Sequence, residues 1–274
     1  MPTQPANERI RNFDEVALGY TAKLAKDEAD RCLNCKNAPC MSGCPVGVHI
    51  PDFIANVKQG NIQGAYRVLK NDNNLAAICG RVCPQENQCE KHCVRKDKLG
   101  GSVAIGNLER YVADQAIANG YDERPQIVKI GKRVAVVGSG PASLSCAADL
   151  ARCGVDVTMY EALHEAGGVL VYGIPEFRLP KALVKKEIDK VRALGVDIET
   201  NVVVGKTIFI EELLFEYDAV FIGTGAGVPM LLKVKGENLN GVYSANEYLT
   251  RINLMKAYKN DAITPVKRGK NVVV

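Results

Sequence analysis

The chain has 274 residues, of which 47% are hydrophobic and 24% are charged, as in ordinary globular proteins with room for two domains. The net charge of +4, without a basic stripe interleaved with aromatic residues, argues against nucleic-acid binding. No apolar run approaches the roughly 20 residues that span a bilayer, and the first 13 residues lack the apolar core of an export signal. We therefore expect a cytoplasmic protein that binds neither nucleic acid nor membrane.

Eight of the ten cysteines lie between Cys32 and Cys93, in the patterns C-x2-C-x4-C-x3-C-P and C-x3-C-P-x4-C-x3-C. In a reducing cytosol such thiols hold metal rather than form disulfides. Zinc remains an alternative, because paired cysteines suit tetrahedral sites. A proline directly after Cys44 and after Cys83 is typical of ferredoxins, where the cysteine before proline ligates the other cluster. The pattern therefore favours two [4Fe–4S] clusters with interleaved ligands in a helical N-terminal domain.

The N-terminal domain is predicted to contain helices near 21–31, 51–59 and 61–70, followed by a helix from about 103 to 116. On that last helix Glu109 falls on the apolar face. A buried carboxylate needs a partner, because an unpaired charge is costly in an apolar environment. The partner is either a cation, such as Arg95, Arg110 or a lysine, or a metal cluster.

A dinucleotide-binding motif begins at residue 133. Residues 133–137 read as a buried strand, a glycine turn follows, and a helix runs from about 141 to 153. A second strand, 156–161, ends at Glu161, which suits a ribose hydroxyl. Ser143 occupies the third glycine position, so we expect a slightly displaced helix and a retained site. The residues predicted to cradle the phosphates are Gly138, Ser139, Gly140, Pro141 and Ala142.

The rest of this domain is predicted to continue the alternation of helices and strands. Helices are expected at 181–194 and 208–215, and strands at 196–199 and 218–222. The fold class is therefore α/β, a Rossmann-like sheet preceded by an all-α domain. Cys146 and Cys153, on or near the first helix, are expected to be ordinary packing residues. Spacing alone does not decide between FAD and NAD.

Four runs resemble the glutamate synthase small (β) subunit family: RNFDEVALGY, CLNCKNAPCMSGCPVGVHIPDFI, AAICGRVCPQENQCEKHC and AIGNLERYVAD. That family includes the large subunit of NADH-dependent ferredoxin:NADP oxidoreductase and the N-terminal half of dihydropyrimidine dehydrogenase, and the resemblance covers essentially the whole chain. It implies one cluster on Cys32, Cys35, Cys40 and Cys93, and a second on Cys44, Cys83, Cys89 and Glu109. Counting thiols would instead make Cys79 the eighth ligand. The carboxylate on the apolar face leads us to expect Glu109.

The same resemblance implies FAD as the nucleotide. Residues 166–180 are similar to the family's flavin-holding loop, in which Gly168, Val169 and Arg178 would contact the cofactor. Val204 matches the position where the family's chain passes the adenine. Gly225 lies in a loop similar to the one that closes on FAD.

The expected domains are residues 1–125, the iron–sulfur domain, and residues 126–267, an incomplete FAD domain. Residues 268–274 repeat the form of the strand before the first glycine turn, so they are expected to form the first strand of a truncated NAD(P)H-binding domain.

The resemblance implies an electron-transfer subunit that carries electrons from NAD(P)H through FAD and the clusters to a larger partner in a hetero-oligomer. A ferredoxin-linked bifurcating enzyme or a dihydropyrimidine dehydrogenase is an alternative parent. A metal-binding docking subunit without catalysis is the alternative from another class.

Overall fold

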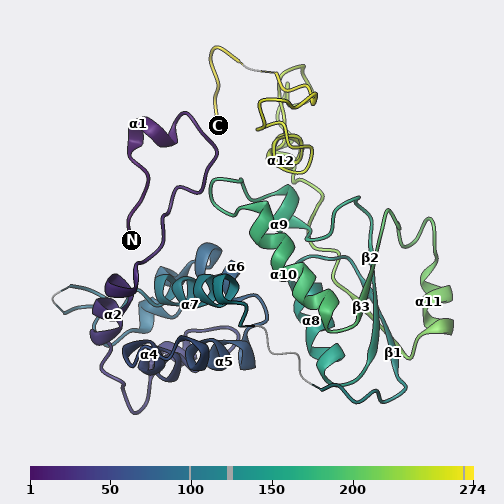
Figure 1. The fold of residues 1–274 in the computed structure, drawn as a ribbon. Coiled ribbons are helices and arrows are strands. Elements are labelled where there is room, and N and C mark those ends of the chain that lie inside the picture. The colour runs from purple at the N-terminus through teal and green to yellow at the C-terminus, as the bar shows by residue number, and fades with distance from the viewer. Residues whose placement is uncertain (99, 122–125, 268) are drawn as a thin grey trace. The chain divides into compact units, whose positions relative to one another are not determined.

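The computed structural model describes residues 1–98, 100–121, 126–267 and 269–274. The chain forms two compact units, Met1–Gln126 and Ile127–Val274 (Figure 1). No helix among the described residues has the length and apolar character needed to cross a membrane.

The first unit is helical, as predicted. Its elements are α1 (Ala6–Arg9), α2 (Ala22–Asp30), α3 (Pro39–Ser42), α4 (Ile50–Lys58), α5 (Ile62–Asp72), α6 (Ala76–Val82), the 3-10 turns η1 (Gln85–Asn87) and η2 (Glu90–His92), and α7 (Ile105–Asn119). Thr21 caps α2 by accepting a hydrogen bond from the Leu24 N–H, and Asn61 caps α5 in the same way. Helices α4, α5 and α7 bury Phe53 and Leu108 between them.

Helix α6, which the sequence pattern did not predict, packs against α7 with almost no space between the two backbones. A Cβ atom placed on Gly80 of α6 would lie 2.5 Å from the backbone nitrogen of Arg110 in α7. Only glycine therefore permits this approach. The contact places the helix that carries Cys79 directly against the helix that carries Glu109.

An ion-pair network on α6 and α7 holds the N-terminal segment of the chain. Arg81 lies 2.8 Å from a carboxylate oxygen of both Glu15 and Asp114. Arg110 lies 3.0 Å from Glu15 and 3.3 Å from Asp114. The two guanidinium groups are almost fully buried, so each depends on these carboxylates for its stability.

The second unit contains a four-stranded parallel sheet in the order β3-β2-β1-β4. Its elements are β1 (Arg133–Val137), α8 (Pro141–Arg152), β2 (Asp156–Glu161), α9 (Val169–Tyr172), α10 (Lys181–Ala193), β3 (Val196–Thr200), α11 (Ile210–Glu216), β4 (Ala219–Ile222) and α12 (Ala245–Ile252). In Figure 1, α8 and α10 cover one face of this sheet and α11 lies on the other. Leu213 of α11 packs on Ala135 and Val137. This is the predicted Rossmann-like arrangement.

The strand expected at residues 268–274 is not formed in the described part of this segment. Residues 269–274 belong to no strand, and Val272 and Val273 are exposed. A strand needs a neighbouring strand to satisfy its peptide groups, and the described residues offer this segment none. Residue 268 lies outside the described residues. That the segment begins a second nucleotide-binding domain stays a prediction.

Candidate cluster and nucleotide sites

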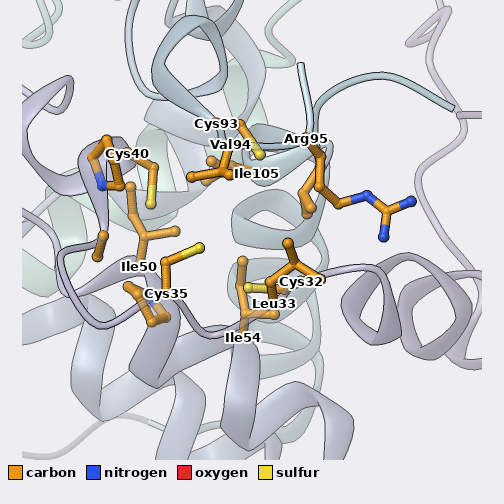
Figure 2. Close-up of a pocket in the computed structure, with 14 residues that line it drawn as sticks. Cys32, Leu33, Cys35, Cys40, Ile50, Ile54, Cys93, Val94, Arg95 and Ile105 are labelled. Carbon is orange, nitrogen blue, oxygen red and sulfur yellow. The ribbon is translucent and has the colours of Figure 1, made fainter. Parts of the chain in front are cut away.

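Four thiols of the first unit line one small cavity. Cys32 follows α2, Cys35 lies in the next loop, Cys40 belongs to α3, and Cys93 follows η2. Figure 2 shows their sulfur atoms turned toward a common space, with aliphatic side chains around it. These are the four residues that the resemblance assigned to one cluster.

The four thiols line one cavity without crowding around a single point. Zinc holds each sulfur at about 2.3 Å, so its ligands must crowd around one point. In the described residues no three histidine, cysteine or acidic side chains converge in that way. Burial, together with the charges of Cys32 and Cys93, raises the pKa of Cys40 to about 11. Binding iron would therefore release a proton that the free thiol holds firmly.

A second group of possible ligands comes from α3, α6, η2 and α7. Cys44 follows α3, Cys83 ends α6, and the buried Cys89 precedes η2. Burial raises the pKa of Cys89 to about 12, and the charges of Glu90, Glu109 and Cys44 add to this shift. That these three thiols and Glu109 together hold the second cluster, as the resemblance implies, stays a prediction.

Glu109 is buried on α7 and pairs with no cation among the described residues. Its Oε1 accepts a hydrogen bond of 2.7 Å from the Asn73 amide. Burial first, and the charge of Cys83 second, raise the pKa of Glu109 to about 8. The expected alternative, an ion pair with Arg110, does not form, because Arg110 pairs with Glu15 and Asp114 instead. The buried carboxylate therefore has one hydrogen-bond donor and no counter-ion among the described residues, and its role as a cluster ligand stays a prediction.

Cys79 lies in the same group, so both candidates for the eighth ligand are present. Its sulfur is 3.6 Å from Asn73 Oδ1, and a hydrogen bond with Cys83 together with burial raises its pKa. The same hydrogen bond lowers the pKa of Cys83. Sequence reasoning missed Asn73, since a single asparagine between two helices carries no motif.

The glycine turn of the second unit has the shape of a phosphate cradle. Gly138 has φ of +91°, and a Cβ placed on it would lie 2.6 Å from the Gly223 carbonyl oxygen. Gly140 precedes α8, and a Cβ placed there would meet nothing within 4 Å. The open space at the start of a 12-residue helix fits a pyrophosphate, which the helix N–H groups stabilise. Pro141 and Ala142 form the first turn of that helix.

Glu161 is tied to the turn by Ser139. Its Oε2 accepts a hydrogen bond of 3.0 Å from the Ser139 N–H and a second from the Ser139 hydroxyl. That hydroxyl also accepts a 2.9 Å bond from the Gly167 N–H. Glu161 Oε1 accepts a third hydrogen bond, of 2.8 Å, from the Leu163 N–H. The remaining acceptor capacity of the carboxylate is what a ribose hydroxyl could use. The serine thereby links the phosphate turn, the ribose acid and the loop that begins at Ala166.

Ser143, the departure at the third glycine position, is fully buried. Its hydroxyl donates a 3.2 Å hydrogen bond to the Gly223 carbonyl after β4. The buried hydroxyl that takes the place of glycine therefore has a hydrogen-bond acceptor. The turn is retained, as expected. The displacement of the helix stays a prediction.

The remaining predicted residues lie on three loops. Gly168 contacts the turn closely, since a Cβ on it would lie 2.9 Å from the Gly140 Cα. Val169 and Arg178 are exposed on the segment around α9. Val204 forms an isolated β-bridge with Ile208, and Gly225 is exposed in the loop after β4. That these five residues contact a nucleotide stays a prediction.

Comparison with known proteins identifies the second unit. The family model of the pyridine nucleotide-disulphide oxidoreductases matches residues 132–274, more than half of the chain. The chain belongs to this family. A second model, described as dihydropyrimidine dehydrogenase domain II with a 4Fe-4S cluster, matches residues 9–121 of this oxidoreductase. The helical unit that gathers the thiols is therefore an iron–sulfur domain.

This pyridine nucleotide-disulphide oxidoreductase has relatives that are longer than itself. It is 43% identical to AegA of Escherichia coli K12 over 88% of the chain and 37% of AegA. It is 38% identical to the glutamate synthase [NADPH] small chain of Halomonas elongata over 99% of the chain and 58% of that protein. With the dihydropyrimidine dehydrogenase subunit PreT of E. coli K12 it shares 38% identity over 80% of the chain and 54% of PreT. The chain thus spans 37% to 58% of these relatives.

Proposed function

We propose that the chain is the electron-transfer part of an NAD(P)H-dependent oxidoreductase, most like the glutamate synthase small subunit. The proposal rests on one observation: a single chain combines two groups of possible cluster ligands in its first unit with a glycine turn suited to phosphate in its second. A bound flavin can exchange either one or two electrons, which links nicotinamide chemistry with the single electrons of iron–sulfur clusters.

The first unit would enclose the clusters with its own side chains. We assign Cys32, Cys35, Cys40 and Cys93 to one cluster and Cys44, Cys83, Cys89 and Glu109 to the other. The aliphatic side chains Ile50, Ile54 and Ile105 line the cavity beside the first group and would shield one side of a bound cluster from water. Burial of this kind is one of the features that set the reduction potential of a cluster.

The second unit would orient FAD through backbone groups. The start of α8 would bind the pyrophosphate, and Glu161 would accept the ribose hydroxyls. Gly138 and Gly168 leave the glycine turn free of side chains, so that the pyrophosphate could come close to its backbone. We assign Val169 and Arg178 to the flavin side, and Val204 and Gly225 to the adenine side and the closing loop.

The proposed partner is a larger subunit that accepts the electrons. Support comes from the relatives named glutamate synthase small chain, at 38% identity. The similarity to PreT, named a dihydropyrimidine dehydrogenase subunit, makes a pyrimidine-reducing partner the second candidate. We also propose that the protein works in the cytoplasm, where cysteines stay reduced and can ligate clusters.

An anaerobic purification of the chain tests the proposal. We expect a brown protein with about eight irons and about eight sulfides per chain, the content of two [4Fe–4S] clusters, and one FAD. Zinc without flavin would overturn the proposal and leave a metal-binding docking subunit. Mass spectrometry of proteins that copurify with the chain would distinguish a glutamate synthase large subunit from a pyrimidine-reducing one.

A further inference from the structure

Asn73 lies between the two candidates for the eighth cluster ligand. It is 5% exposed and follows α5, just before the helix that carries Cys79. Its Nδ2 donates a 2.7 Å hydrogen bond to Glu109 Oε1. Its Oδ1 accepts a 2.9 Å hydrogen bond from the Leu75 N–H and faces the sulfur of Cys79 at 3.6 Å.

The backbone fixes which end of this amide faces which ligand. The Leu75 N–H can only donate, so the Asn73 atom beside it must be the oxygen. The two ends of an asparagine amide are otherwise interchangeable in shape, and only such a partner assigns them. The NH2 group of Asn73 is therefore the end that faces Glu109.

Asn73 consequently presents a hydrogen-bond donor to Glu109 and a hydrogen-bond acceptor to Cys79. Glu109 faces a hydrogen-bond donor, which stabilises a carboxylate and holds Oε1, so that Oε2 is the oxygen left for iron. Cys79 faces a carbonyl oxygen, which accepts a hydrogen bond from a thiol but would repel a thiolate. An iron ligand must be a thiolate. The same amide thus favours one ligand and disfavours the other.

We propose that Asn73 is a positioning residue that selects Glu109 rather than Cys79 as the eighth cluster ligand. This inference rests on the proposed function, since it requires a cluster at the second group of ligands. It concerns the orientation of ligands, and Asn73 itself does not touch iron.

The decisive variant is Asn73→Asp in the full chain, purified anaerobically. Aspartate has the same size and keeps an oxygen for the Leu75 N–H, but it places a second oxygen opposite Glu109. We expect the EPR spectrum of the reduced protein and the midpoint potential of one cluster to change. Asn61→Asp is the matched control, because it makes the same substitution at an exposed helix cap away from the thiols. It should leave both readouts unchanged.

Cys79→Ser completes the test and does not depend on how well Asn73→Asp folds. In the wild-type background we expect Cys79→Ser to retain about eight irons. In the Asn73→Asp background we expect the same substitution to remove about four irons, because Cys79 has then replaced Glu109.

The outcomes distinguish the two proposals. A wild-type chain without clusters contradicts the proposed function. A wild-type chain with two clusters, one of which is lost in Cys79→Ser alone, overturns the role of Asn73. An Asn73→Asp protein with the spectrum and potential of the wild type overturns it as well.

Discussion

The two units hold their candidate sites in opposite ways. In the first unit the site is made of side chains that the protein itself encloses, such as the buried Cys89 and Glu109. In the second unit the site is made largely of backbone at an open surface, where Val169, Arg178 and Gly225 are exposed. A cluster needs covalent ligands and exclusion of water, whereas a dinucleotide needs N–H groups and room to approach.

The two candidate sites should therefore be sensitive to different kinds of substitution. The first unit concentrates ionisable groups in its interior: the side chains of Arg81, Arg110 and Glu109 are all nearly inaccessible to solvent. The candidate nucleotide site of the second unit instead depends on the absence of side chains at a few backbone positions, as the contact between α6 and α7 does at Gly80 in the first unit. Loss of a ligand should therefore damage the candidate cluster sites, and gain of a methyl group should damage the candidate nucleotide site.

The largest expected effect is the loss of one cluster. Cys35→Ala should lower the iron content from about eight to about four per chain, because one of four thiolates is missing. FAD should remain bound, since the two units form separate compact bodies. Iron and flavin assays after anaerobic purification measure both. The control is Cys153→Ala, which removes an exposed thiol outside both sites and should change neither value.

In the second unit, one added methyl group at Gly138 should abolish FAD binding. In Gly138→Ala the new Cβ would lie 2.6 Å from the Gly223 carbonyl oxygen at a φ of +91°. We expect loss of FAD with full iron content. Gly131→Ala separates collision from backbone strain, because Gly131 also has positive φ but has nothing within 4 Å. If both variants lose FAD equally, the collision is not the cause.

A smaller effect is expected from the ion-pair network. Arg81→Ala should lower the free energy of unfolding of the first unit by about 3 kcal/mol, because it leaves Glu15 and Asp114 with one guanidinium partner. Urea unfolding followed by circular dichroism measures the change. Lys26→Ala removes one partner of an exposed pair with Asp30 and should not move the midpoint detectably. Equal effects would show that burial of Arg81 does not matter.

The smallest expected effect concerns the serine at the third glycine position. Ser143→Ala should cost about 1 kcal/mol of stability, because the Gly223 carbonyl loses its donor. FAD should still bind, since the glycine turn is unchanged. Flavin content and thermal unfolding test this prediction together. Loss of FAD in this variant would show that the hydroxyl takes part in shaping the phosphate cradle.

Much of this organisation could be predicted from the sequence, because local patterns carry it. Periodicity predicted α7 and its buried carboxylate, and the strand–turn–helix pattern predicted β1, the glycine turn and α8. Cysteine spacing indicated two clusters with interleaved ligands, whereas the family resemblance, not the spacing, implied that Cys93 joins Cys32, Cys35 and Cys40 from the distant second run of cysteines.

What the sequence did not predict depends on distant contacts. Helix α6 is short and contains a glycine, so its stability comes from packing on α7 rather than from propensity. Asn73 is separated by 36 residues from the carboxylate that it contacts. The valines at the end of the chain have strand propensity but no partner strand among the described residues. Each of these features depends on contacts between segments that are distant in the sequence.

The close contact at Gly80 has a consequence for the speed of electron transfer. Because the backbones of α6 and α7 touch, the helix that precedes Cys83 has no room to move closer to the helix that carries Glu109. If Cys83 and Glu109 hold a cluster, as we propose, this contact would limit how far the two ligands move together when the cluster gains an electron. A small movement of the ligands lowers the reorganisation energy, which would favour fast electron transfer.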